Sequence, residues 1–262
     1  MIFKILKKDF LRNKIINMAI FVFILLSALL LASGTNMLIN LNNSLRYLFE
    51  KSSVPHFIQA HSGNVNQKEI DNWSTNNQYV KRQQTCEMIN IQGDNIYINS
   101  DKSEKDSVID MGFVKQNKSF DYLLDLNNEI KPGEIGVPIY YLKKRDLSPG
   151  DKVMIKDGDF ELDFSIKSFV RDAQMNPSII SSKRFVVSDT DFKKLKANTG
   201  EEENLISFQL HDTSNLQKFS NQYDHSNLPQ KGPTVDYKIL SIFNSLTDGL
   251  IAAVIVLISL VL

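Results

Sequence analysis

Two long apolar segments enclose about two hundred residues in which apolar and polar positions alternate over short distances. The first segment, residues 15–34, carries no charge, and at 1.5 Å per residue it is long enough to cross a hydrocarbon core of about 30 Å. The second, residues 249–262, covers only about 21 Å as a helix, so a span there must begin earlier or continue beyond Leu262. The pattern predicts two transmembrane helices with one large polar region between them.

Helical spacing continues past the first apolar segment. The apolar positions that carry it are Met37, Leu38, Leu41, Leu45, Leu48 and Phe49. This near-helical series predicts a stalk over residues 35–53 that extends the first transmembrane helix. Val54-Pro55 should end the stalk, because the residue before a proline is disfavoured in a helix.

The region between the spans reads as short strands and helices in alternation. In its first half we expect a helix at 66–76 and a buried segment of ambiguous type at 120–126. The predicted strands are 54–60, 79–91, 95–99 and 107–114. Residues 92–94, Gln-Gly-Asp, are expected to turn strands 79–91 and 95–99 into a hairpin.

The second half has sharper turn signals. Pro149-Gly150 at the centre of residues 147–151 predicts a type II turn, and Asp-Gly-Asp at 157–159 predicts a hairpin. The predicted strands are 134–139, 152–156, 160–170, 184–187 and 205–211. The predicted helices are 140–146, 190–197 with Ser188-Asp189 at its start, and 214–223 with Asp212-Thr213 at its start. Residues 200–203 are expected to form an acidic loop, and residues 231–233 to break the chain before a final helix.

These elements indicate an α+β fold: a membrane-anchored mixed α/β domain of two small subdomains between two transmembrane helices. The expected divisions are a basic cytoplasmic segment at 1–14, a transmembrane helix at 15–34, a stalk at 35–53, an extracytoplasmic domain at 54–235, and a second stalk and transmembrane helix at 236–262.

Charge sets the expected orientation. Residues 1–14 hold five basic residues and only Asp9 as an acid, a net charge of +4, which predicts a cytoplasmic N-terminus and an extracytoplasmic middle region in the plasma membrane. Residues 2–12 also have one apolar helical face, which favours contact with membrane lipid over a segment that only sets topology. The long apolar run favours a retained anchor over a cleaved signal peptide. The neutral net charge gives no indication of nucleic-acid binding.

Few residues suggest chemistry. Cys86 is the single cysteine, so no internal disulfide can form; with His56 or His61 it could serve a transpeptidase, but packing in a strand is the favoured interpretation. The spacing of these histidines, and of His211 and His225, does not match a metal site. Asp248 precedes the second apolar segment and is expected to be solvated at the membrane boundary. We therefore predict no catalytic, cofactor-binding or metal-binding residue and no cofactor.

Residues 133–173 resemble a block in the extracytoplasmic domain of MacB-like and FtsX-like ABC transporter permeases. The matching features are Leu147, Gly150 and Asp151 in a turn between strands, and the ending Val170–Asp172. The strand and helix at 184–196 and the basic run Leu11-Arg12-Asn13-Lys14 before the first helix resemble the family too, whereas residues 54–132 match only in general pattern.

The resemblance implies a permease subunit that is not an enzyme. A separate ABC ATP-binding subunit would hydrolyse ATP, since this chain has no GxxxxGK[ST] loop. It further implies a permease dimer or a second permease half, and export or mechanotransmission, with antimicrobial peptides or lipid-like molecules as substrates.

A different class of protein fits the same two-span arrangement: the extracytoplasmic sensor half of a histidine kinase or chemoreceptor. Residues after Leu262 would separate the two, because a receptor continues into a polar helix and a permease into further apolar spans. The sequence does not determine the transported substrate, the direction of transport, the partner's identity or the oligomeric state.

Overall fold

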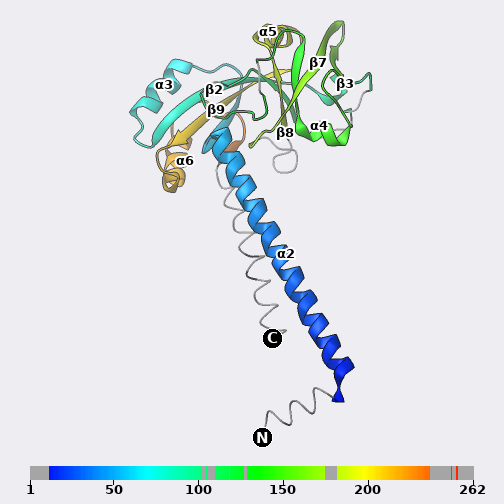
Figure 1. Cartoon of the computed structure of the whole chain (residues 1–262). Helices are drawn as coiled ribbons and strands as arrows, with labels where there is room; N and C mark the ends of the chain where they lie inside the picture. The colour runs from blue at the N-terminus through cyan, green and yellow to red at the C-terminus, as the bar shows by residue number, and fades with distance from the viewer. Residues whose placement is uncertain are drawn as a thin grey trace. The chain divides into compact units, whose positions relative to one another are not determined.

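The computed structural model describes residues 12–101, 104–105, 110–117, 119–126, 129–174 and 182–236, together with residues 249 and 252 (Figure 1). The predicted interfacial helix at 2–12 therefore lies outside the described residues except for Arg12. The predicted second span lies outside them except for residues 236, 249 and 252. The chain divides into two compact units, one made of Met1–Tyr47 and Ile239–Leu262 and the other of Leu48–Lys238.

Helix α2 (Lys14–Ser52) contains 39 residues, which corresponds to about 58 Å at the usual rise. It runs through Gly34 without interruption, so the predicted continuation of helical structure past the first apolar segment is confirmed. Among the described helices, α2 alone has the length and apolar composition to cross a membrane. The exposed large apolar side chains of the described residues also all lie on α2, from Ile15 to Tyr47.

The strands of Leu48–Lys238 form one mixed sheet, which has ten strands among the described residues. In chain order they are β1 (Phe57–Ser62), β2 (Val80–Asn90), β3 (Ile96–Ile98), β4 (Asp110–Val114), β5 (Glu134–Pro138), β6 (Lys152–Asp157), β7 (Phe160–Val170), β8 (Ser182–Val187), β9 (Glu201–Leu210) and β10 (Thr234–Asp236). Their order across the sheet is β10-β1-β9-β2-β4-β8-β5-β7-β6-β3. The α+β class is confirmed, with one compact unit in place of the two small subdomains that we expected.

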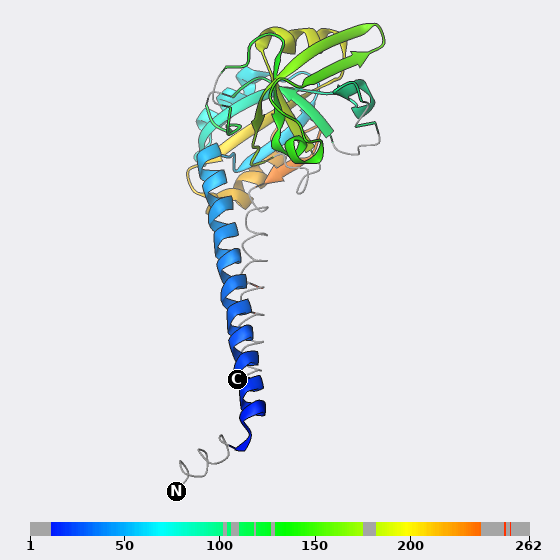
Figure 2. The ribbon, with the colours of Figure 1, turned by 45° about the vertical axis from the view of Figure 1, so that its right-hand side comes forward.

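Two pairs of neighbouring strands, β4 with β8 and β5 with β7, are parallel, and the other neighbours are antiparallel. The turn that leads into β6 is the predicted one: Asp151 N donates to Ser148 O at 3.1 Å, and Gly150 has φ +98°. Gly158, with φ +58°, lies in the turn of the predicted β6–β7 hairpin. Figure 2 shows this hairpin, in light green, extending past its neighbours.

In the described part of the domain, four helices pack on the sheet: α3 (Gln67–Asn76), α4 (Ile139–Lys144), α5 (Asp189–Asn198) and α6 (Leu216–Asp224). The Ser188 side chain accepts from Asp191 N at the start of α5, as predicted. Asp212 likewise accepts from Ser214 N in the short 3₁₀ turn η2 (Thr213–Asn215) before α6. The predicted helix at 66–76 is α3.

Two local predictions were wrong. The hairpin of 79–91 with 95–99 does not form: residues 92–95 include the 3₁₀ turn η1 (Gly93–Asn95), and β3 pairs with β6 instead. Burial explains the choice, since Ile96 and Ile98 are almost completely buried where they lie against β6. Residues 201–203 are not a loop but the start of β9, with their backbones paired to β2. Strand β10 was also not predicted.

The hydrophobic core is divided by the sheet. One face carries Phe113 and Phe185 with residues of α4 and α5, and Ile206 and Phe208 with residues of α3 and α6. The register places these side chains on the same face, because partners directly opposite each other point the same way. The other face carries a smaller apolar cluster that includes Cys86, and there irregular segments cover the sheet. The chain leaves α2 on this second face.

Candidate functional site

Helix α2 ends in a Schellman motif, a fixed type of helix end. Ser53 adopts a left-handed conformation with φ +48°. Val54 N donates to Phe49 O at 3.3 Å, and Ser53 N donates to Glu50 O at 3.1 Å. Phe49 and Val54 are both buried, as the apolar contact of this motif requires. The direction in which the chain leaves the helix is therefore fixed before Pro55.

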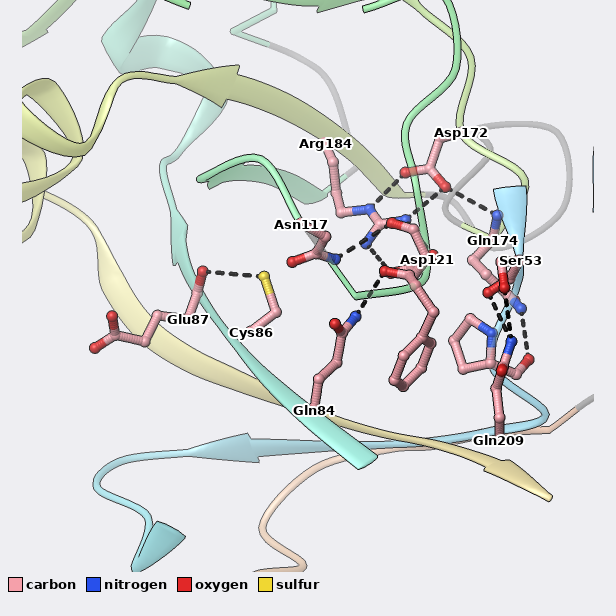
Figure 3. Close-up of polar contacts among 12 residues, drawn as sticks. Ser53, Gln84, Cys86, Glu87, Asn117, Asp121, Asp172, Gln174, Arg184 and Gln209 are labelled. Atoms are coloured by element: carbon pink, nitrogen blue, oxygen red, sulfur yellow. Dashed lines mark hydrogen bonds and ion pairs between the residues drawn. The ribbon is translucent and has the colours of Figure 1, made fainter. Parts of the chain in front are cut away.

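We call residues 52–55, with the groups that bind them, the joint. Each of the four consecutive carbonyls of residues 52–55 accepts a hydrogen bond from elsewhere in the domain. The donors, at 2.7–3.0 Å, are the backbone N–H groups of Tyr122 and Asp121 and the side-chain amides of Gln209 and Gln174. Figure 3 shows the two glutamines beside Ser53. Carbonyls at a helix end have no partner within the helix, and here the domain supplies one for each.

Arg82 on β2 reinforces the joint from the sheet. Its guanidinium donates to Ser53 Oγ at 3.0 Å and to Gln209 Oε1 at 2.5 and 2.9 Å. It also donates to Ser119 O at 3.0 Å and lies 5.2 Å from the centre of the Phe120 ring. Arg82 thereby fixes the orientation of the Gln209 amide, whose nitrogen donates to the joint.

A buried ion cluster lies beside the joint (Figure 3). Arg184 on β8, only 1 % exposed, binds Asp121 through two nitrogens at 2.5 and 3.1 Å. It binds Asp172 through two nitrogens at 2.6 and 2.8 Å. Two carboxylates thus share one guanidinium in a bidentate arrangement, the strongest form of this contact.

The electrostatics favour a permanently charged Arg184. Burial alone would lower its pKa, but Asp121 and Asp172 raise the pKa well above its ordinary value. Burial raises the pKa of Asp121, an effect that Arg184 opposes. Removal of the guanidinium would leave two carboxylates without a cation in a buried site.

Both carboxylates connect the cluster to the joint. Asp121 has φ +56°, and its backbone N–H donates to Ser53 O. Asp172 accepts from Gln174 N at 2.9 Å, and the Gln174 side chain donates to Pro55 O. Two hydrogen-bonded connections therefore link Arg184 to the end of α2. One passes through Asp121 to Ser53, and the other through Asp172 and Gln174 to Pro55.

The segment around Asp121 is irregular, which resolves the ambiguous type of residues 120–126. Phe120 is fully buried, and its carbonyl accepts from the Gln84 side chain on β2 at 3.0 Å. Asn117 donates to Asp121 O at 3.3 Å. In place of a regular ladder, side-chain hydrogen bonds and one isolated backbone bridge between Leu124 and Arg171 hold this segment.

The sheet also places the last described strand, β10, beside the start of β1, the strand that follows the joint. Strand β10 pairs with β1, and Phe57 lies directly opposite Asp236. The first residue of β1 after the joint and the last residue of β10 are therefore neighbours. Strand β1 therefore contacts both connections of the domain: the joint precedes it in sequence, and β10, which precedes residues 237–262, pairs with it.

The residues singled out for chemistry are not brought together. Cys86 is buried with its pKa raised to about 11 by burial, so the thiol stays protonated. Its strand partner Leu205 lies opposite Ala60, whereas His61 lies one residue further along β1, so Cys86 and His61 point to opposite faces of the sheet. The register thus does not assemble the cysteine–histidine pair of a transpeptidase.

The histidines have structural partners. His56 Nδ1 accepts from Leu210 N at 3.0 Å, and His61 Nδ1 accepts from Lys231 N at 3.1 Å. His211 and His225 are exposed, and Asp248 lies outside the described residues. Within the described part of the chain, no group of three or more His, Cys, Asp or Glu side chains could hold a metal ion.

Sequence reasoning missed the buried charges of β8. Lys183, next to Arg184, points to the other face and is completely buried; it contacts Glu104 at 3.2 Å and donates to Tyr141 Oη at 2.8 Å. Burial lowers the pKa of Lys183 and Glu104 opposes that shift. The sequence held a signal: two adjacent basic residues directly precede the apolar run Phe185-Val186-Val187, and a cation buried with that run requires a carboxylate.

Comparison with known proteins gives a similarity of fold but no match of sequence. No protein-family model matches this sequence, and no curated protein matches it. Among solved structures, the chain is similar to the periplasmic region of MacB from Actinobacillus actinomycetemcomitans. The TM-score is 0.38 at 10 % identity, over 75 % of this chain and 94 % of that one. The similarity is partial at this TM-score, and it says nothing of what the chain binds or moves.

Proposed function

We propose that this chain forms the first membrane-spanning helix and the extracytoplasmic domain of an ABC transporter permease. The basic run at residues 11–14, the apolar helix and the block at 133–173 support the family assignment. In this proposal the N-terminus is cytoplasmic, and Leu48–Lys238 lies outside the membrane. A separate ATP-binding subunit hydrolyses ATP, and the permease acts with a second permease copy or half.

The observation that carries the mechanical part of the proposal is the joint. Helix α2 is continuous from Lys14 to Ser52, and the domain binds every carbonyl of residues 52–55. A rigid, packed connection passes on a displacement, whereas a flexible linker absorbs it. Movement of α2 driven by the ATPase would therefore reach the sheet through Gln209, Gln174 and Asp121.

The same joint would serve a sensor, with the signal travelling from the domain to the helix. The permease is favoured because residues 133–173 and 11–14 resemble that family. Co-purification separates the two: a permease should retain an ATP-binding subunit, whereas a sensor should retain a kinase or signalling helix.

A break in α2 tests the proposal. Replacing Leu41→Gly together with Asn42→Pro should interrupt the helix, at a cost of about 3 kcal/mol or more from the proline. The matched control is Leu41→Ala with Asn42→Ala, which keeps a helical backbone. We expect the Gly-Pro variant to insert, to bind its ATPase and to hydrolyse ATP, but to lose transport or resistance that the Ala-Ala variant retains. Full transport by an inserted Gly-Pro variant would contradict the proposal.

A further inference from the structure

Strand β1 has a second connection to the membrane-directed parts of the chain, which we call the return segment, residues 231–236. The segment ends in β10, an edge strand of three residues paired only with β1 in the described sheet. Beyond it the sequence continues toward the apolar residues 249–262. The return segment is mostly exposed, so apolar burial contributes little to holding it.

Among the side chains of β1 that bind the return segment, buried Gln59 makes the most contacts, and His61 adds one hydrogen bond from Lys231 N. Gln59 of β1 is 2 % exposed, and its amide nitrogen donates to Gly232 O at 2.7 Å, with a longer contact to Pro233 O at 3.5 Å. Its amide oxygen accepts from Thr234 Oγ1 at 2.8 Å. The same nitrogen also donates to Ala60 O at 2.8 Å. Gln59 therefore binds three consecutive residues of the return segment with both ends of one amide.

Backbone contacts depend on the same close approach. Ala60 N donates to Pro233 O and Ser62 N donates to Lys231 O, each at 3.0 Å. A Cβ atom at Gly232 would lie 2.6 Å from Ala60 O, so the segment runs closer to β1 than a larger residue would allow. The amides of Ala60 and Ser62 are thus protected only while the return segment stays in place.

We infer that Gln59 is a positioning residue that fixes the return segment to β1, so that the domain moves with both of its connections rather than with α2 alone. The inference rests on the proposed function for its consequence in transport. The claim that Gln59 fixes the return segment depends only on the contacts of Gln59 described above. Loss of Gln59 would leave an exposed edge strand bound to β1 by backbone pairing and by the hydrogen bond from Lys231 N to His61, so the strand should open more readily.

A reversible covalent replacement for Gln59 provides the test. Gln59 and Thr234 are directly opposite each other in register, at a spacing that a disulfide can bridge. We would make Gln59→Cys with Thr234→Cys in full-length permease carrying Cys86→Ser. The oxidised protein holds the return segment through a disulfide, whereas the reduced protein has neither the disulfide nor the glutamine. The two states share one sequence, so each is the control for the other.

Two measurements are made in both states. Hydrogen exchange of the Ala60 and Ser62 amides should accelerate about tenfold or more on reduction, since several hydrogen bonds of about 1 kcal/mol each are lost. Transport with the cognate ATPase should be near wild type when oxidised and should fall at least severalfold when reduced. The Cys86→Ser protein, treated with the same reductant, should change in neither measurement.

The outcomes separate the inference from the proposed function. Unchanged exchange on reduction overturns the inference, whatever transport does. Faster exchange with unchanged transport also overturns it, provided that the Leu41-Asn42 Gly-Pro variant has lost transport. If that Gly-Pro variant transports normally, the proposed function fails, and the exchange result alone decides whether Gln59 holds the return segment.

Discussion

The domain is attached to the flanking segments in two different ways. The joint after α2 is buried, and four consecutive carbonyls of residues 52–55 have separate donors backed by Arg82 and Arg184. The return segment is an exposed edge, and its side-chain contacts with β1 come chiefly from Gln59. The first connection has many partners and the second has few.

This difference predicts which of the two connections should open first by local unfolding. Local opening follows the least buried part of a structure, so the return segment should open at a lower free energy than the joint. A connection with many buried partners keeps its geometry when one partner is lost, unless the loss leaves a charge without its counter-ion.

The largest effect is expected from Arg184→Met. Two buried carboxylates would lose their shared cation, which should destabilise the domain by about 3–5 kcal/mol. Thermal unfolding of the full chain in detergent micelles measures the loss. The matched control is Arg171→Met, which breaks an exposed ion pair with Asp125 and should cost less than about 1 kcal/mol. Equal losses in the two variants would show that the cluster does not stabilise the domain.

Acid should weaken both connections through histidine. Burial is the main cause that lowers the pKa of His56 and of His61, with Lys81 and Lys231 adding to it respectively. The unfolded chain then binds more protons, so this stabilisation is complete above the ordinary imidazole pKa of about 6.5. It is lost as pH falls from there toward the lowered values, by at most about 1.4 kcal/mol per histidine for each pH unit.

Single variants separate the two histidines. Asparagine can accept a hydrogen bond at any pH, so His56→Asn should remove the acid sensitivity near the joint and His61→Asn that of the return segment. Hydrogen exchange at the Leu210 and Lys231 amides, compared at pH 5 and pH 7.5, reports each site. Wild-type exchange that shows no added opening at pH 5, after correction for the intrinsic rate, would exclude this acid effect.

The smallest effect is expected at Ser53. Its left-handed backbone costs a non-glycine residue roughly 1 kcal/mol, while its hydroxyl accepts from Arg82 and Gln209. Ser53→Gly removes the backbone strain but also loses the hydroxyl's hydrogen bonds, so its effect on the free energy of unfolding should be close to zero. Ser53→Ala loses the hydroxyl without relief, and should cost about 1 kcal/mol. A glycine variant less stable than the alanine variant would contradict the Schellman assignment.

Local features could be predicted from the sequence. The extent of α2, the turn at Pro149-Gly150 and the Ser188 cap each depend on residues within a few positions, so the spacing of residue types was sufficient. The strand at β3 was predicted, but its pairing was predicted wrongly, because its partner β6 is chosen by burial and not by the adjacent turn.

The joint could not be predicted for the same reason. Arg184 is 63 residues from Asp121, and Gln209 is 156 residues from Ser53. Periodicity shows that a side chain is on one face of an element but does not show which distant polar group it meets there. Basic residues adjoining the apolar run of β8 were the available hint, and they indicate that partners exist without identifying them.

The adjacent cations of β8 have a consequence for how the sheet assembles. Lys183 requires Glu104 on one face, and Arg184 requires Asp121 and Asp172 on the other. A slip of β8 by one residue would exchange the two faces and present each cation to an apolar layer. Most registers of an apolar strand differ little in burial, but this pair makes the neighbouring registers costly. Electric charge, placed near the middle of the sheet, thereby selects one alignment among several that hydrophobicity alone would accept.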